Sequence, residues 1–289
     1  MHMHHSNNKK KIAGWLLANV FIACVSTVAA QPYLDILNLK YVSSPDAGLF
    51  NQNKNAVKIR HIGFTTNIPI RLKNKKDAVI LSPFWENWLL KINNQNQESY
   101  HSVALPVSLS KSIPYTRWSY LLTAIVRMND SVINSKGQWQ VGGAIISSYK
   151  RHERLTLKLG LYINNEFFGV FVMPLVGIDW KIDAGNNLFG ILPGNLTYEH
   201  KINSRFYYGV NFRAITNSYS KDKGYQRVNE NQLGFFLDTY LSKKFVINIE
   251  AGHSFYRKLE SGVKHISKLN AEVNDNLYVR ATLAYRIRF

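Results

Sequence analysis

Apolar and polar residues alternate over unusually long stretches of this chain. Within residues 277–289 every odd-numbered position is apolar, and Arg280, Arg286 and Arg288 lie between them. A period of two is the pattern of a β-strand with one apolar face. Strands in globular proteins usually have about 5–6 residues, whereas a tilted strand that crosses a bilayer needs about 9–11. The length of the alternation therefore predicts a membrane-spanning strand rather than a strand of a soluble sandwich.

The same alternation recurs from residue 33 onward and predicts about fourteen strands. Two segments are weaker, because residues 187–192 are few and the alternation in residues 78–88 is irregular. Without them the number would be twelve, and single-chain bacterial barrels have even strand numbers in either case. The predicted strands begin near Tyr33, Val57, Ala78, Tyr100, Trp118, Trp139, Leu155, Val172, Asn187, Leu196, Phe206, Asn231, Phe245 and Leu277.

The connections between these segments fall into two kinds. Short, turn-like connections are residues 73–77, 151–154, 183–187, 201–205 and 242–244. Longer, polar connections are residues 43–55, 91–99, 129–138, 217–231 and 261–276. Short turns at one end and longer loops at the other are typical of membrane barrels. We therefore predict an all-β fold, a transmembrane antiparallel up-and-down β-barrel.

The first thirty residues have the organisation of a secretory signal peptide. A basic stretch that ends at Lys11 precedes an apolar run that begins at Ile12, and small residues lead to Ala30. This order is that of the three regions of such a leader, and the apolar run is too short to span a bilayer. We expect cleavage between Ala30 and Gln31, which leaves residues 31–289 as the barrel domain. The one cysteine of the chain would be removed with the leader.

The last predicted strand resembles the carboxyl terminus of bacterial outer-membrane proteins, whose terminal strand ends in Phe and is recognised by the barrel assembly machinery. The residues that carry this resemblance are Leu283, Tyr285, Ile287 and Phe289. Two proline-led segments that run to tight turns, from Pro174 and from Pro193, are similar to uncharacterised outer-membrane β-barrel families of Gram-negative, Bacteroidota-type bacteria. These resemblances imply an outer-membrane location and assembly by that machinery. They imply no catalytic residues.

The polar faces of the predicted strands would line the barrel interior. They carry charges of both signs, at Lys158, Asp179, Lys181, Glu199, Lys201, Arg213, Asp238, Glu250 and Arg280. These charges could be solvated in a water-filled channel, or they could pair with one another in a closed interior. Barrels of about eight strands leave no pore and those of 16–18 strands leave an open one, so fourteen strands would allow a narrow channel.

The charge of the chain first suggests nucleic acid as a partner. Lys and Arg number 36 against 18 Asp and Glu, which gives a formal net charge of +18. The basic residues are spread over turns, loops and inward-facing positions rather than gathered in one stripe, and export would separate the chain from cytoplasmic nucleic acid. We therefore expect outer-membrane lipids and the phosphates of lipopolysaccharide as partners, and no nucleic acid.

The histidines of the mature chain give no catalytic or metal-binding spacing. Of the six, His253 is next to Ser254, so the two would point to opposite faces of a strand, and no H-x-H or H-E-x-x-H pair occurs. Phosphate-loop and nucleophile-elbow patterns are also missing from the sequence. We expect no enzyme, no cofactor and no metal site. The predicted function is a narrow passive pore for small solutes, the alternatives being a closed structural or adhesive barrel and a barrel-embedded lipid hydrolase.

Overall fold

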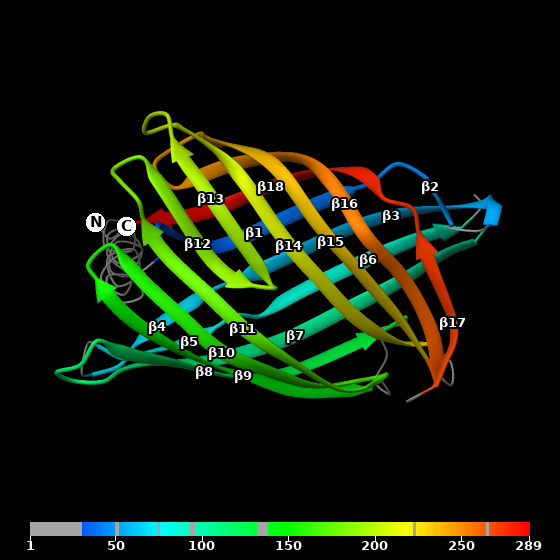
Figure 1. Cartoon of the computed structure of the whole chain (residues 1–289), viewed down its shortest axis with the longest axis horizontal. Helices are drawn as coiled ribbons and strands as arrows, with labels where there is room; N and C mark the ends of the chain where they lie inside the picture. The colour runs from blue at the N-terminus through cyan, green and yellow to red at the C-terminus, as the bar shows by residue number, and fades with distance from the viewer. Residues whose placement is uncertain are drawn as a thin grey trace, which may run out of the picture.

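The chain forms one antiparallel sheet that closes on itself (Figure 1). The computed structural model describes residues 31–49, 52–73, 76–92, 96–131, 138–221, 224–263 and 266–289. The predicted signal peptide, up to Ala30, lies outside these residues. Closure is made by the first and last strands, β1 (Tyr33–Ser43) and β18 (Asn276–Arg288), which pair in antiparallel register from Tyr33 opposite Arg288 to Ser43 opposite Val279.

The remaining strands follow one another around the wall in chain order. Their bounds are β2 (Ala47–Leu49), β3 (Gln52–Thr66), β4 (Ile68–Arg71), β5 (Ala78–Leu81), β6 (Phe84–Ile92), β7 (Asn96–Ser112), β8 (Trp118–Asp130), β9 (Trp139–His152), β10 (Leu155–Glu166), β11 (Gly169–Lys181), β12 (Asn186–Leu192), β13 (Asn195–Lys201), β14 (Phe206–Lys221), β15 (Gly224–Tyr240), β16 (Phe245–Val263) and β17 (Ile266–Val273).

These elements make a closed wall of fourteen strands, which confirms the predicted fold class and strand number. β3 with β4, and β5 with β6, are single wall strands interrupted at Asn67 and at Ser82–Pro83, and β7 pairs with both β5 and β6. Pro83 has no N–H to donate to the ladder, and its carbonyl oxygen accepts from the N–H of Thr66 at 3.0 Å. This interruption explains why the alternation in residues 78–88 is irregular. The short strands β2 and β17 pair at one end of the barrel, outside the fourteen.

Four of the five predicted long loops are largely strand, which corrects the sequence analysis. Residues 217–231 pair in the β14–β15 hairpin up to Lys221 opposite Gly224, and residues 261–276 contain β17. Residues 43–55 contain β2 and the start of β3, and residues 91–99 contain the end of β6 and the start of β7. Polar composition suggested loops here, but the strands continue past the apolar part of the wall. We call this continuation the extension; it consists of β2, β17 and the adjoining ends of β3, β6, β7, β14, β15 and β16.

The short turns at residues 151–154, 183–187, 201–205 and 242–244 lie where they were predicted, and side chains close them; the predicted turn at residues 73–77 lies partly outside the described residues. At the β11–β12 turn, the Asp183 carboxylate accepts hydrogen bonds from the N–H groups of Gly185 (2.7 Å) and Asn186 (2.8 Å) and from the Asn186 side chain. These donors, the side-chain amide of Asn186 first, lower the pKa of Asp183. Asn203 closes the β13–β14 turn by accepting from the N–H of Arg205 and of Phe206.

The outer face of the wall is apolar, and its side chains are exposed. Leu159 of β10 is 66% exposed and Phe235 of β15 is 72% exposed, while the inward positions of the same strands hold buried polar residues such as Glu166 and Asp238. Aromatic side chains lie at both borders of this face. On β9 they are Tyr149 and Trp139, and on β16 they are Phe245 and Tyr256. The two members of each pair are separated by about the 9–11 residues that a tilted strand needs to cross a bilayer. We call this zone the apolar belt. Among the described residues, no helix is long and apolar enough to span a membrane.

A charge placed in the middle of the apolar belt should destabilise the protein. In a bilayer, Leu159→Arg should lower the free energy of unfolding by about 2–4 kcal/mol, because an arginine at the midplane of a membrane barrel loses its hydration. Urea unfolding in lipid vesicles, followed by tryptophan fluorescence, measures this change. Lys181→Ala at the exposed end of β11 is the control and should change stability by less than about 0.5 kcal/mol. Equal effects of the two substitutions would show that the belt does not face lipid.

Candidate functional site

The barrel interior contains many ion pairs, and several of them join strands that are not neighbours in the wall. Arg213 of β14 binds the Glu250 carboxylate of β16 through two nitrogens, at 2.5 and 2.7 Å. Arg286 of β18 lies between two carboxylates, with Asp35 of β1 and Asp238 of β15 each at 2.5 Å. The inner charges are therefore largely neutralised by one another rather than by water.

At the turn end of the barrel, arginines and tyrosines pack into a cluster. It contains Tyr33, Asp35, Phe189, Glu199, Tyr207, Asp238, Tyr240, Arg286 and Arg288, and we call it the turn-side cluster. The guanidinium of Arg286 lies 3.6 Å from the ring centre of Tyr33, and that of Arg288 lies 3.8 Å from the ring centre of Tyr207. Arg288 also binds Glu199 of β13 and donates to the Tyr240 hydroxyl. Cation–π contacts of this kind are strongest where water is excluded.

This cluster reaches across the barrel. Tyr33 of β1 contacts the Phe189 ring of β12 at 5.4 Å between centres, although six neighbour-to-neighbour steps around the fourteen-stranded wall separate the two strands. Side chains from nearly opposite walls therefore meet across the interior at its turn end.

A second set of contacts crosses the interior nearer the other end. Glu166 of β10 accepts from Arg127 of β8 (2.5 Å), Gln140 of β9 (2.9 Å) and the Ser218 hydroxyl of β14 (2.5 Å). The Ser131 N–H, just after β8, donates to the carbonyl of Ser220 in β14 at 3.1 Å. We call these contacts the cross-barrel bridge.

The short β12–β13 hairpin makes the cross-barrel bridge possible. β12 and β13 have seven residues each, whereas β11 has 13 and β14 has 16. Beyond this hairpin β14 has no β13 partner, and it approaches β8 and β10 instead (Figure 1). The prediction that residues 187–192 form an unusually short strand therefore identified the element that shapes the interior.

Beyond the cross-barrel bridge the extension has an apolar core. The buried residues of this core are Ala47, Val57, Ile59, Trp88, Leu90, Tyr100, Tyr219, Val228, Leu259 and Val273. They come from β2, β3, β6 and β7 on one side and from β14 to β17 on the other. In the extension, the two walls therefore pack against each other as in a sandwich. We call this core the apolar cap.

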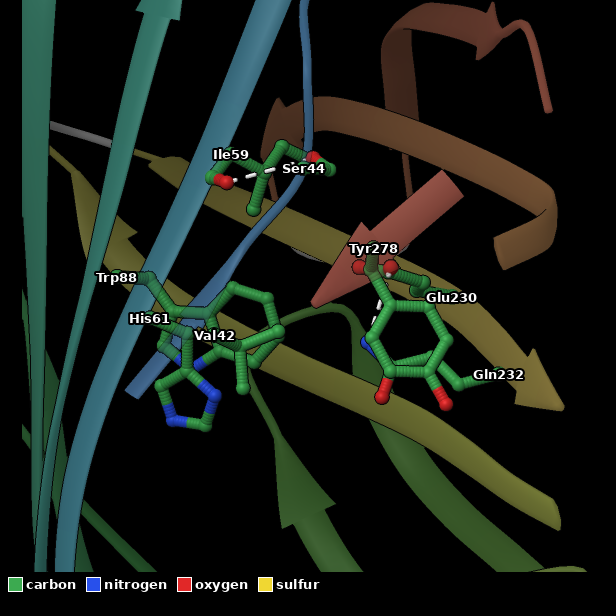
Figure 2. Close-up of a pocket in the computed structure, with 8 residues that line it drawn as sticks. All are labelled: Val42, Ser44, Ile59, His61, Trp88, Glu230, Gln232 and Tyr278. Carbon is green, nitrogen blue, oxygen red and sulfur yellow. Dashed lines mark hydrogen bonds between the residues drawn. The ribbon is translucent and has the colours of Figure 1, made fainter. Parts of the chain in front are cut away.

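A small cavity lies between the apolar cap and the charged interior. Figure 2 shows Val42, His61 and Trp88 on one side of it, and Glu230, Gln232 and Tyr278 on the other. His61 stacks on Trp88 with ring centres 4.2 Å apart, and its Nε2 is 3.2 Å from Glu86. This geometry makes His61 a buried structural group. No cluster of three or more His, Cys, Asp or Glu able to hold a metal ion occurs in the described part of the chain.

The structure places the nine predicted interior charges in two groups. Lys181 and Lys201 lie at the exposed turn ends of β11 and β13. The other seven lie on the buried side of the wall: Lys158 with Asp179 (2.5 Å), Arg213 with Glu250, Glu199 with Arg288, Asp238 with Arg286, and Arg280 with Gln232 (2.8 Å). The last strand exposes Leu283 and Phe289 on the outer face, and Tyr285 and Ile287 share that face.

Sequence reasoning missed several interior residues. Arg127, Glu166 and Ser218 of the cross-barrel bridge were not singled out. Arg286 and Arg288 were placed on the polar face of the last strand, which includes Arg280, but they were not named among the interior charges. Tyr33 was identified only as the start of the first strand. The bridge could not have been found from a local pattern, because it joins strands whose contact depends on the shortness of β12 and β13.

Removing Arg286 should be costly, because it leaves Asp35 and Asp238 without their shared cation. Breaking a buried pair from one side costs about 3–5 kcal/mol, so Arg286→Met should lower the free energy of unfolding by an amount of this order. Urea unfolding in detergent micelles measures the loss. Lys258→Met is the matched control, because Lys258 pairs with Glu272 at an exposed site and should cost less than about 1 kcal/mol. Similar losses in both variants would show that the buried pair contributes no more to stability than the exposed pair.

Comparison with solved structures finds bacterial outer-membrane barrels at low similarity. The NanC porin has a TM-score of 0.40 and 10% identity, covering 87% of this chain and 100% of that chain. The toluene transporter TodX of P. putida has a TM-score of 0.41 and 10% identity, covering 92% of each chain. The translocator domain of the autotransporter NalP from Neisseria meningitidis has a TM-score of 0.37 and 12% identity, covering 97% of this chain and 98% of that chain. Similarities this low assign neither a substrate nor a mechanism.

No curated protein sequence matches the chain. A family model does match, and it covers nearly all of the barrel, from residue 36 to residue 286. Its two ends fall in β1 and β18, the strands that close the wall. The chain belongs to the family described as domain of unknown function DUF6268.

Proposed function

We propose that this chain is an outer-membrane β-barrel that provides a narrow pathway for small solutes, and that the structure is its closed state. The observation that carries the proposal is the combination of an apolar outer belt with an interior of polar and charged side chains inside a wall of fourteen strands. Barrels of about eight strands can be filled by side chains alone. A wider wall lined by charges has the dimensions and polarity to pass hydrated solutes once the contacts across its interior separate.

The turn-side cluster and the apolar cap are the two barriers on this pathway. The turn-side cluster is held by cation–π contacts and ion pairs, and the cap by apolar packing. The charged residues between them have both signs, as the Arg213–Glu250 and Lys158–Asp179 pairs show. Such a lining favours small polar or zwitterionic solutes over ions of one sign, because neither sign finds a uniform field.

The proposed location is the outer membrane of a Gram-negative, Bacteroidota-type bacterium. The apolar belt, the aromatic borders and the outward-facing apolar side chains of β18, Leu283 among them, support it. The proposal includes export by a signal peptide cleaved after Ala30 and insertion by the barrel assembly machinery. Exposed basic residues of the extension, Arg60 among them, would then face the phosphates of lipopolysaccharide.

A closed structural or adhesive barrel is a second candidate function. The apolar cap favours it, since ten buried residues from both walls join the extension into one packed unit. An extension of this kind could present a surface to a partner and need no pathway at all.

Electrical recordings distinguish the two functions. In planar lipid bilayers the wild type should give small, reproducible conductance steps, and Tyr33→Ala combined with Arg288→Ala should enlarge them several-fold by opening the turn-side cluster. Tyr198→Ala on the outer face of β13 is the control and should leave the conductance unchanged. Heat-modifiable gel mobility confirms that each variant is folded. If neither the wild type nor the double variant conducts despite insertion, the pore is excluded and the closed barrel is favoured.

A further inference from the structure

The outer surface carries a serine–histidine pair that the pathway does not use. Ser99 and His101 lie two residues apart on β7, so both side chains point outward, on the face that continues with Val103 and Leu105. The Ser99 hydroxyl oxygen is 3.2 Å from His101 Nε2. A hydroxyl at this distance from a neutral imidazole can transfer its proton to it and become a nucleophile.

A third side chain, Asn87, holds the pair from the neighbouring strand. Asn87 of β6 is directly opposite His101 in the register, and its side chain is buried. Its amide nitrogen donates to the Ser99 hydroxyl at 2.7 Å. The same nitrogen lies 3.1 Å from His101 Nδ1 and 3.5 Å from Nε2, so it contacts the imidazole ring rather than one of its nitrogens. Asn87 therefore holds the Ser99 oxygen next to the His101 ring, which is what a nucleophile and its base require.

The pair lies at one border of the apolar belt. Val103, the next outward residue of β7, is opposite Met128 of β8, which is opposite Trp139 at the border. His101 is two residues nearer the extension along β7 and is opposite Asp130. Ser99 is two residues nearer still and is opposite Leu89. A lipid in the outer leaflet would therefore have its acyl chains along Val103 and Leu105, and its ester groups at the level of Ser99 and His101.

Basic residues continue this face toward the extension. Arg60 of β3 is opposite Leu89, which is itself opposite Ser99, so Arg60 and Ser99 are two strand spacings apart, about 10 Å. Lys58 and Lys91 are opposite each other, two residues nearer the end of the extension than Arg60 and Leu89. These three cations lie where the anionic headgroup of a bound lipid would be, and charge pairing with its phosphates would fix the ester near Ser99.

From this geometry we propose that Ser99, His101 and Asn87 form a lipid-facing esterase site for the acyl esters of anionic membrane lipids. Ser99 is the nucleophile, His101 is the general base and acid, and Asn87 is a positioning residue. The shared chemistry of the substrates is a carboxylic ester at the membrane surface beside a phosphate-bearing headgroup. Glycerophospholipids and lipopolysaccharide both provide it.

The reaction proceeds in two steps through an acyl-enzyme. The Ser99 oxygen attacks the ester carbonyl carbon while His101 Nε2 takes the hydroxyl proton. The carbon–oxygen bond to the lipid alcohol then breaks, and His101 returns the proton to that oxygen. In the second step His101 takes a proton from water, the resulting hydroxide attacks the acyl-Ser99 ester, and the Ser99 oxygen recovers its proton from His101 as the fatty acid leaves. One water is consumed for each ester cleaved.

Labelling with a serine-directed fluorophosphonate tests the nucleophile directly. The full chain, folded in detergent micelles, should be labelled, and mass spectrometry of its peptides should place the label on Ser99. Ser99→Ala should abolish the labelling. Ser147→Ala is the matched control, because Ser147 lies on the outer face of β9 opposite Leu159, and it should be labelled as the wild type is.

Hydrolysis assays test the base, the positioning residue and the substrate class. Fatty-acid release from phosphatidylglycerol vesicles and from purified lipopolysaccharide is measured in separate arms, and the faster arm identifies the source of the ester. His101→Ala should slow release by about 10²–10⁴-fold, whereas His253→Ala on the outer face of β16 should not change it. Asn87→Ala should lower kcat with KM unchanged. Conductance should be the same in all of these variants, so this proposal and the proposed pathway fail independently.

Two outcomes would overturn the esterase site. One is a folded wild type, verified by heat-modifiable mobility, that releases no fatty acid in either arm and labels no more than Ser99→Ala. The other is activity that persists in Ser99→Ala, which would place the nucleophile elsewhere.

Discussion

Backbone hydrogen bonding in a medium without water is the constraint on which this structure depends. A strand that crosses a bilayer must pair all of its N–H and C=O groups within the protein, and only a closed sheet does so for every strand. Here the requirement is met where β1 and β18 join, over the length of both strands. Closure gives the wall two different surfaces. One faces outward and is apolar, and the other is enclosed and can hold charges.

Contacts between strands that are not neighbours in the wall cross the enclosed surface. Arg286 with Asp238, Tyr33 against Phe189, and Glu166 with β8 and β14 join positions that are far apart in the sequence. An unpaired charge in such a place destabilises the protein, whereas a paired one is tolerated. Any open state of the proposed pathway must therefore hydrate these charges as they separate.

On the outer surface, the border between the apolar belt and the extension combines apolar, reactive and basic residues. Along β7 and its neighbours, Val103, His101 and Ser99 follow one another outward, and Arg60 lies beside them. A membrane lipid has the same order of chemical groups, from acyl chain to ester to phosphate. This correspondence supports the esterase proposal independently of the interior, because the pathway needs none of these residues.

The sequence by itself determined the strands, their number and the face that each presents, because a period of two is a local property and survives in any β-structure. The fourteen predicted segments are the fourteen wall strands, and the shortness of residues 187–192 was visible before the structure. The sequence analysis did not single out the Ser99-x-His101 spacing, although residues two apart share a face of a strand. Asn87 joins this pair only through the β6–β7 register, which no local pattern shows. The tertiary structure alone decided that the polar segments around residues 217–231 and 261–276 are strands, and which inner charges pair. The first depends on how far each hairpin keeps its pairing, and the second on how closely side chains of different strands approach, and no local pattern encodes either.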